Sequence, residues 1–207
     1  REVTLTASEP ILWGLDVARF GGDNSALCIR QGNTVLEITT FNSMDLMQLC
    51  GAIKNRYDDS TVMERPQEIL VDVIGLGSGV VDRLAEQNLP VRGVNVAEAP
   101  STKKNYLNLR AELWFAIKDW LAQRDCRLPN NDELASELAA PQYKYTSSGK
   151  IKIESKDEMR KRGIKSPDKA DALALTMASS AASFGGSQAF MGYNFKKPLK
   201  SRIFRVG

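Results

Sequence analysis

The chain has 207 residues, enough for one domain with a full hydrophobic core, and no apolar run reaches the length of about 18 residues that suggests a membrane span. It contains no histidine, which excludes Ser-His-Asp and Cys-His catalysis and His-rich zinc sites. The three cysteines, Cys28, Cys50 and Cys126, are widely spaced, which favours packing residues in a reducing compartment. The chain begins at Arg1 without a signal-peptide pattern, so we expect a domain of a longer polypeptide.

The net charge of +3 conceals two oppositely charged parts. Residues 1–140 hold 14 Lys and Arg against 20 Asp and Glu, a balance of −6. Residues 141–207 hold 14 Lys and Arg against 5 Asp and Glu, a balance of +9. A basic C-terminal third on an acidic body indicates a contact with a polyanion on one side of the protein.

The first half of the chain reads as short strands followed by alternating helices and strands. Apolar and β-branched runs separated by turn residues predict strands over residues 10–18, 25–30, 34–41, 68–73 and 91–96. Apolar residues at helical spacing predict helices from the cap Ser43 to about Tyr57, from the glycine turn at 75–79 through Ala85, and over about 107–122.

The second half continues with a short helix over residues 131–139 and a β-hairpin over 142–154 around a Ser-Ser-Gly turn. A last helix is expected to start with Ser166 as N-cap and Pro167 in the first helical position. From Ser183 the sequence is rich in Gly and Ser and then basic, which is typical of a flexible tail. We therefore expect one folded domain over 1–182 and a tail over 183–207.

The order of these elements predicts the fold class. Three antiparallel strands followed by β-α-β indicate an α/β protein with a mixed central sheet and helices on both faces. This order resembles the ribonuclease H-like arrangement, and that resemblance implies a catalytic Asp in the first strand.

Three carboxylates occur where apolar residues are expected. Asp16 and Asp72 each follow an apolar strand run, and Asp171 lies on the packing face of the last helix. An unpaired buried carboxylate is strongly disfavoured, and two of them about 4 Å apart repel by roughly 4 kcal/mol at an effective dielectric of about 20. No buried basic partner is evident in the sequence. A divalent cation held by oxygen ligands, Mg²⁺ or Mn²⁺, would offset the repulsion.

Other candidate positions have structural explanations. Asp168 lies three residues before Asp171, and a carboxylate in the first turn of a helix is favoured by the helix dipole. Asp23 fits a turn. The glycines at 75–79 fail the G-x-G-x-x-G spacing of a dinucleotide site, and we expect them to let the backbone turn tightly beside Asp72.

The hairpin is the strongest candidate for nucleic-acid binding. Lys144, Lys150 and Lys152 alternate with Tyr and Ile residues, so the lysines can meet phosphates while the apolar face packs on the protein. The basic stretch that follows, which includes Lys156, Arg160 and Lys161, continues this surface toward Asp168.

Three motifs taken together resemble the nuclease domain of tailed-phage terminase large subunits. They are GLDVARFG at 14–21, VDVIGLGSG at 71–79 and SPDKADALAL at 166–175, and the resemblance covers roughly residues 10–182. It implies a ribonuclease H-like endonuclease that cuts concatemeric viral DNA during genome packaging in the host cytoplasm. It also implies that Asp16, Asp72 and Asp171 bind two Mg²⁺ or Mn²⁺ ions about 3.5–4 Å apart. Asp168 is a further candidate ligand, because family members differ in which acid of such a pair binds metal.

The same resemblance implies double-stranded DNA as substrate, and as partners an ATPase domain of the same polypeptide, the portal and the small terminase subunit. No G-x-x-x-x-G-K-[ST] motif occurs, so this chain is not expected to hydrolyse ATP. Two alternatives remain open. One is half of an actin- or hexokinase-like ATPase, since residues 16–22 could form a phosphate loop. The other is a DNA-binding module without catalysis, in which the acids are structural.

Overall fold

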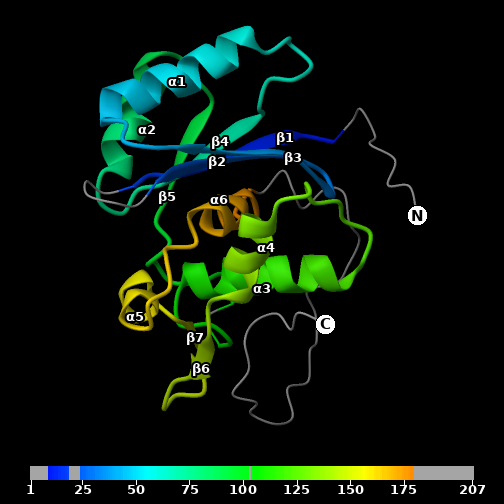
Figure 1. Cartoon of the computed structure of the whole chain (residues 1–207), viewed down its shortest axis with the longest axis vertical. Coiled ribbons are helices and arrows are strands. Elements are labelled where there is room, and N and C mark those ends of the chain that lie inside the picture. Colours follow the sequence, from blue (N-terminus) through cyan, green and yellow to red (C-terminus); the bar gives the residue numbers. More distant parts are fainter. Residues whose placement is uncertain (1–8, 19–23, 103, 180–207) are drawn as a thin grey trace.

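The computed structural model describes residues 9–18, 24–102 and 104–179. The turn predicted at Asp23 and the tail predicted at 183–207 lie outside these ranges. Within them, five strands form one mixed sheet in the order β3-β2-β1-β4-β5 (Figure 1). The strands are β1 (Ile11–Asp16), β2 (Ser25–Gln31), β3 (Thr34–Phe41), β4 (Glu68–Asp72) and β5 (Val91–Val94). Strands β1, β2 and β3 are antiparallel neighbours, and β4 and β5 run parallel to β1, which confirms the predicted mixed topology.

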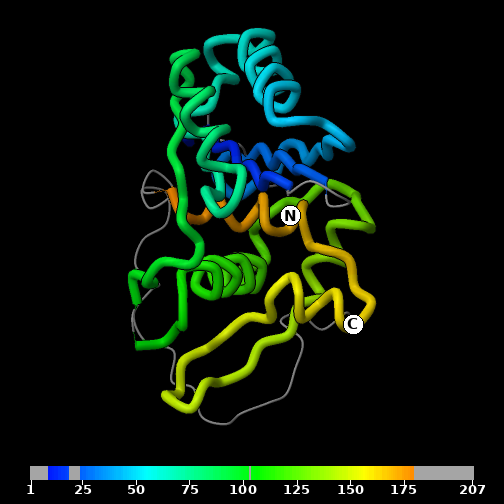
Figure 2. Tube along the Cα trace, turned by 90° about the vertical axis from the view of Figure 1, so that its left-hand side faces the viewer, coloured from blue at the N-terminus to red at the C-terminus, as the bar shows by residue number. Residues whose placement is uncertain are grey.

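Helices cover both faces of the sheet, as predicted. Helices α1 (Leu46–Asp59) and α2 (Gly77–Glu86) lie on one face, and α6 (Asp168–Thr176), α4 (Asp132–Ala139) and α3 (Leu109–Ala122) lie on the other (Figure 1). The hairpin of β6 (Tyr143–Tyr145) and β7 (Ile151–Ile153) extends away from the sheet, and α5 (Lys156–Lys161) follows it (Figure 2). In the described ranges no helix is long and apolar enough to cross a membrane.

The alternation of side chains along β1 divides the core between the two faces. Trp13 and Leu15 pack into the cluster that includes the buried residues of α1 and α2. Gly14 and Asp16 therefore point to the opposite face, toward α6. Strand β4 follows the same rule, since Val71 belongs to the first cluster and Leu70 packs with Leu175 of α6. The three cysteines are free thiols, with Cys28 and Cys50 buried, as expected of packing residues.

Two predicted helix starts were wrong. Helix α1 is capped by Asp45, not Ser43, because Asp45 and Gln48 form a reciprocal capping box, whereas Ser43 has φ of 55°. Pro167, not Ser166, is the N-cap of α6. Helix α5 was not predicted, although Ser155 and Glu158 form the capping box that starts it. Helix α2 begins at Gly77, so the later glycines of the expected turn lie inside the helix.

Candidate active site

Asp16 ends the central strand of the sheet and faces α6. All six residues of β1 are buried, and Asp16 is 3% exposed. After Asp16 the chain is held to β2 by a hydrogen bond of 3.0 Å from the Ala18 N–H to Ser25 Oγ. The first predicted acid is therefore fixed at the carboxyl end of a strand that is covered on both sides.

Asp72 lies at the same edge of the sheet, on the neighbouring strand. The parallel register pairs Leu15 with Val71, so the next residues, Asp16 and Asp72, follow at the carboxyl ends of adjacent strands. The Asp72 Oδ1 accepts a hydrogen bond of 3.0 Å from the Ile74 N–H, which turns the chain away from the sheet. A side chain at Gly77 would collide with the Asp72 carbonyl oxygen, so this glycine permits the tight return beside Asp72, as predicted.

Helix α6 brings the other two acids to the same place. All nine of its residues are buried, and it packs against β1, β2 and α3. Asp168 and Asp171 lie in its first turn, and the Asp168 Oδ2 accepts a hydrogen bond of 3.2 Å from the Asn24 N–H. The structure thus brings together Asp16, Asp168 and Asp171 from segments about 150 residues apart in sequence.

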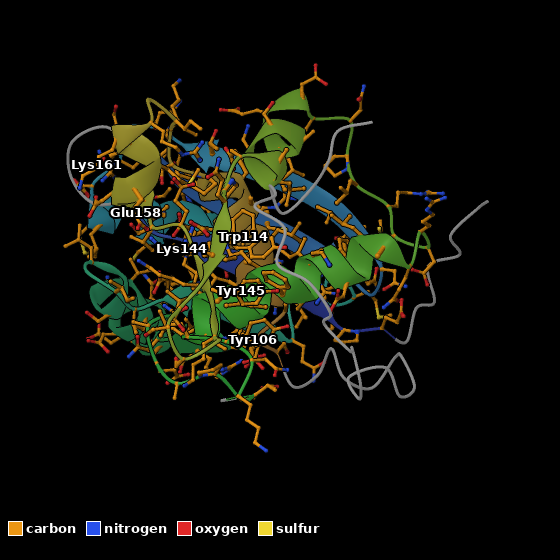
Figure 3. All side chains as sticks on the ribbon, turned by 90° about the horizontal axis from the view of Figure 1, so that it is seen from below. Tyr106, Trp114, Lys144, Tyr145, Glu158 and Lys161 are labelled. Carbon is orange, nitrogen blue, oxygen red and sulfur yellow. The ribbon has the colours of Figure 1, made fainter. Side chains whose placement is uncertain are left out.

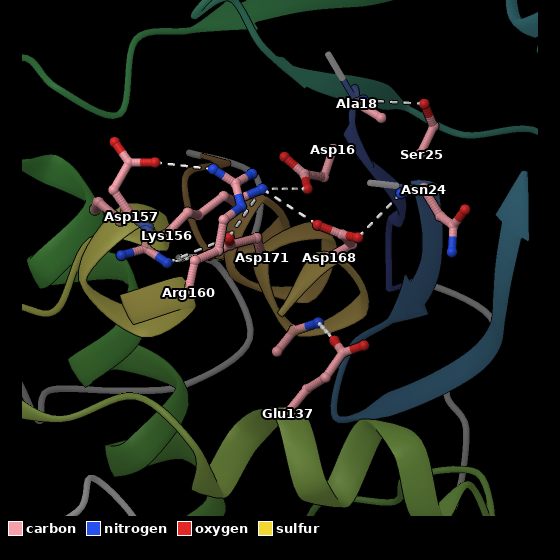
Figure 4. Close-up of polar contacts among 12 residues, drawn as sticks. Asp16, Ala18, Asn24, Ser25, Glu137, Lys156, Asp157, Arg160, Asp168 and Asp171 are labelled. Atoms are coloured by element: carbon pink, nitrogen blue, oxygen red, sulfur yellow. Dashed lines mark hydrogen bonds and ion pairs between the residues drawn. The ribbon is translucent and has the colours of Figure 1, made fainter. Parts of the chain in front are cut away.

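The ammonium of Lys156 lies between these acids (Figure 4). Its Nζ is 2.8 Å from Asp16 Oδ2, 3.4 Å from Asp168 Oδ1 and 3.4 Å from Asp171 Oδ2. The sequence interpretation counted Lys156 as part of the basic surface that runs toward Asp168, and it did not predict that the ammonium lies among the acids. The reason is that Ser155 starts α5 at this point and the first helical residue is directed at the acids.

A second cation, Arg110 of α3, pairs with Asp171. Its Nη2 lies 3.0 Å and 3.2 Å from the two carboxylate oxygens, and Trp114 Nε1 donates a hydrogen bond of 2.8 Å to Oδ1. The expectation that the acids lack a basic partner was therefore wrong. Lys156 and Arg110 come from segments whose sequences show no link to the acidic motifs.

Burial and charge shift the acids in different directions. Burial, with the charges of Asp171 and Asp168, raises the pKa of Asp16 to about 7 against the opposing effect of Lys156. Burial also raises the pKa of Asp72. Burial alone would raise the pKa of Asp171, but Arg110 and Lys156 outweigh it and hold that pKa below its usual value. The pKa of Lys156 is raised, because the three carboxylates outweigh the effect of its burial. The site is therefore a cluster of charged groups in which Asp16, with its pKa of about 7, can take up a proton near neutral pH.

A cavity of about 300 Å³ opens beside the cluster. Asp16, Asp72 and Asp171 line it, together with the cations Arg110, Lys152 and Lys156. Its other walls are Ile74, Val96, Asn108, Leu113, Ile153, Ser155, Ala174 and Leu175. Asp171, the acid of α6 that was predicted to lie on the packing face, borders the cavity, whereas Asp168 is not among its lining residues.

The donor atoms suit a hard cation, although Lys156 holds the central position. Among the described residues, no group of three or more Asp, Glu or Cys side chains is arranged as a ready metal site. Carboxylate oxygens from Asp16, Asp168 and Asp171 nevertheless converge on one positive group, the Lys156 ammonium. Carboxylate oxygens are the ligands that Mg²⁺ and Mn²⁺ prefer, and in this structure the Lys156 ammonium holds the position between them.

The predicted DNA-binding residues lie on the hairpin and α5 (Figure 3). Lys144 and Lys152 are cross-strand neighbours, and both pair with Glu158, at 3.1 Å and 3.3 Å. Arg160 pairs with Asp157 at 2.8 Å, Lys161 is exposed and Lys150 is half-buried. The apolar side of the hairpin packs as expected, since Ile151 and Ile153 are buried and the Tyr143 ring meets Phe115 of α3 edge-on at 5.2 Å.

Known structures share this mixed sheet and its helical layers. The nuclease domain of the large terminase subunit of bacterial virus Sf6 superposes with a TM-score of 0.72 at 22% identity, over 84% of this chain and 90% of that one. The large terminase nuclease of thermophilic phage G20c gives 0.61 at 15% identity, over 83% and 82%. The nuclease domain of Thermus phage P74-26 gives 0.61 at 14%, over 92% and 86%.

These likenesses show that the chain has the fold of phage terminase nuclease domains, which confirms the predicted ribonuclease H-like class. The Sf6 domain has been solved with manganese, in a lysine-to-alanine variant, and the G20c domain with magnesium. No family model and no curated protein matches the sequence.

Proposed function

We propose that this chain is the nuclease domain of a tailed-phage terminase large subunit, and that it hydrolyses DNA phosphodiester bonds with two divalent metal ions. One observation carries the proposal. Carboxylates from β1 and α6 converge within 3.4 Å of a single positive group, at the edge of the sheet where Asp72 also ends its strand. The fold shared with the Sf6 and G20c nuclease domains supports the same reading.

In this proposal Asp16 would contribute to both metal sites, Asp72 to one, and Asp171 with Asp168 to the other. When bound, the ions activate water and stabilise the leaving oxygen, so no histidine is needed. The chain's own groups orient the DNA. Lys152 borders the cavity with the acids and can meet phosphate oxygens beside the scissile bond.

The outer basic residues extend this surface. Lys144 and Lys150 of the hairpin, with Arg160 and Lys161 of α5, would contact the backbone of double-stranded DNA without regard to sequence. We further propose that the folded domain spans 1–182 and that the basic tail of 183–207 serves a partner. The substrate would be concatemeric viral DNA in the host cytoplasm. The partners would be the ATPase domain of the same polypeptide, the portal and the small terminase subunit.

Cleavage of supercoiled plasmid tests the proposal. The chain should nick and linearise plasmid with Mg²⁺ or Mn²⁺ and not with EDTA, whereas Asp16→Asn and Asp72→Asn should bind DNA and leave it uncut. Asp119→Asn, a carboxylate of α3 outside the cavity, is the matched control and should cleave at the wild-type rate. Full activity in Asp16→Asn would overturn the assignment. DNA binding without metal-dependent cleavage in the wild type would favour the non-catalytic module.

A further inference from the structure

Asp171 is held by two residues of α3 that no sequence motif marks. The Asp171 Oδ1 accepts hydrogen bonds from Trp114 Nε1 at 2.8 Å and Arg110 Nη2 at 3.0 Å. The Asp171 Oδ2 accepts a second contact from Arg110 Nη2, at 3.2 Å, and lies 3.4 Å from Lys156 Nζ on the side of the acid cluster. Trp114 therefore holds Oδ1 against α3 and Arg110 bridges the two oxygens, so that Oδ2 is the oxygen that also faces the Lys156 ammonium beside Asp16.

Arg110 and Trp114 are themselves rigidly placed. The Arg110 side chain is 15% exposed, and its Nη1 donates a hydrogen bond of 2.7 Å to the Glu154 carbonyl oxygen. Its guanidinium lies 5.7 Å from the centroid of the Trp114 ring, and Trp114 is fully buried. Arg110 is the second residue of α3, whose start is capped by the Asn108 side chain. The helix therefore fixes the backbone of Arg110, and Asp171 and the Glu154 carbonyl fix its guanidinium.

We propose that Arg110 and Trp114 are positioning residues of the nuclease, which fix the carboxylate of Asp171 so that Oδ2 faces the cation site. This inference rests on the proposed function. Groups that hydrogen-bond a metal-ligating carboxylate set its orientation, and losing them typically costs 10–100-fold in affinity or activity.

The two residues act on charge in different ways. Arg110 carries a fixed positive charge beside the acids, which opposes a second cation at the same place. The Trp114 indole is neutral, so its hydrogen bond affects only the orientation of the Asp171 carboxylate. Removing Arg110 should therefore slow turnover while metal binding becomes tighter, a combination that a damaged fold would not give. Removing the Trp114 N–H should slow turnover and leave metal binding nearly unchanged.

The test combines Mn²⁺ titration calorimetry with the plasmid-cleavage rate at saturating Mn²⁺. Arg110→Gln should lower kcat by about tenfold or more and lower the Mn²⁺ Kd by at least about threefold. Trp114→Phe should lower kcat several-fold with a Kd within about twofold of wild type. Arg110→Lys keeps the positive charge but replaces the planar guanidinium by an ammonium, so the Mn²⁺ Kd should stay at the wild-type value and kcat should fall.

Two matched controls separate positioning from packing. Trp120→Phe removes an indole N–H of the same helix that donates at 3.0 Å to Asn33, and Arg92→Gln removes an arginine paired with Glu68. Both should keep the wild-type kcat and Kd. Rates within twofold of wild type in folded Arg110→Gln and Trp114→Phe would overturn the inference, as would weaker Mn²⁺ binding in Arg110→Gln. Absence of cleavage in the wild type would instead reject the proposed function.

Discussion

Gly14 of β1 lies against the backbone of α6 at Ala172. A side chain at Gly14 would stand far inside van der Waals contact of the Ala172 carbonyl oxygen and 3.0 Å from Thr176 Cγ2. Gly14 precedes Asp16 by two residues on the same face of the strand, and Ala172 follows Asp171. The absence of a side chain at Gly14 therefore sets how closely α6, with its acids, approaches Asp16.

Gly14→Ala should abolish most cleavage and destabilise the protein by about 1–3 kcal/mol, because the methyl group overpacks the contact between strand and helix. Chemical denaturation and plasmid nicking measure the two effects. Gly51→Ala is the matched control, since no atom lies within 4 Å of a side chain added there and alanine favours the α1 helix. Wild-type activity and stability in Gly14→Ala would show that α6 does not depend on this contact.

The sequence predicted the strands and the acids because both depend on local patterns. Asp16 and Asp72 interrupt apolar strand runs, and strand periodicity places them on the α6 side of the sheet. The capping boxes of Asp45 with Gln48 and of Ser155 with Glu158 are also local patterns, but the sequence prediction placed the first cap at Ser43 and predicted no helix after Ser155. The pairing of Lys156 with Asp16 spans 140 residues and depends on how the hairpin and α5 return to the sheet, which no local pattern encodes.

Lys156→Ala should destabilise the metal-free protein by roughly 3–5 kcal/mol, because three carboxylates then face one another without their central cation. Mn²⁺ should raise the melting temperature of this variant more than that of the wild type. Lys54→Ala, which breaks an exposed pair with Asp58 on α1, should cost no more than about 0.5 kcal/mol and leave the Mn²⁺ shift unchanged. Equal Mn²⁺ shifts in the wild type and Lys156→Ala would contradict competition between Lys156 and metal.

Asp171→Asn should lower the plasmid-nicking rate more than Asp168→Asn at every Mn²⁺ concentration. Asp171 borders the cavity and carries one oxygen toward Asp16, whereas Asp168 is also bonded to the backbone N–H of Asn24, just before β2. The isosteric amide preserves an acceptor for Arg110 and Trp114, so the fold should persist. A larger loss in Asp168→Asn would assign the metal ligand to the other acid of the pair.

Replacing Lys144, Lys150 and Lys152 together by Ala should weaken binding to any DNA sequence about equally. The slope of log K against log salt should become shallower by about 0.9 for each lost phosphate contact. Excess DNA should largely restore cleavage, although Lys152 also borders the cavity. The control replaces Lys54, Arg56 and Arg83 on the opposite face, which should leave the slope unchanged. An unchanged slope in the hairpin variant would place the DNA contact elsewhere.

Glu158 joins the hairpin to α5 through its charge. The Ser155 N–H, then Lys144 and Lys152, lower the pKa of Glu158 from 4.5 to about 2. Since the folded pKa is depressed, the stabilisation from this carboxylate is present above pH 4.5 and is lost as the pH falls toward 2. The side chain is 33% exposed, so solvent screening limits the contribution to about 1 kcal/mol.

Glu158→Gln keeps an acceptor for the capping box and removes the charge, so it isolates the electrostatic part of this effect. It should be about 1 kcal/mol less stable than the wild type at pH 7, and the difference should shrink steadily below pH 4.5. Urea denaturation of both proteins from pH 7 to pH 3 measures it. Glu86→Gln, which removes an exposed partner of Arg83 on α2, should differ little from the wild type at any pH. A difference for Glu158→Gln that stays constant with pH would mean that the lysines of the hairpin draw no stability from the Glu158 charge.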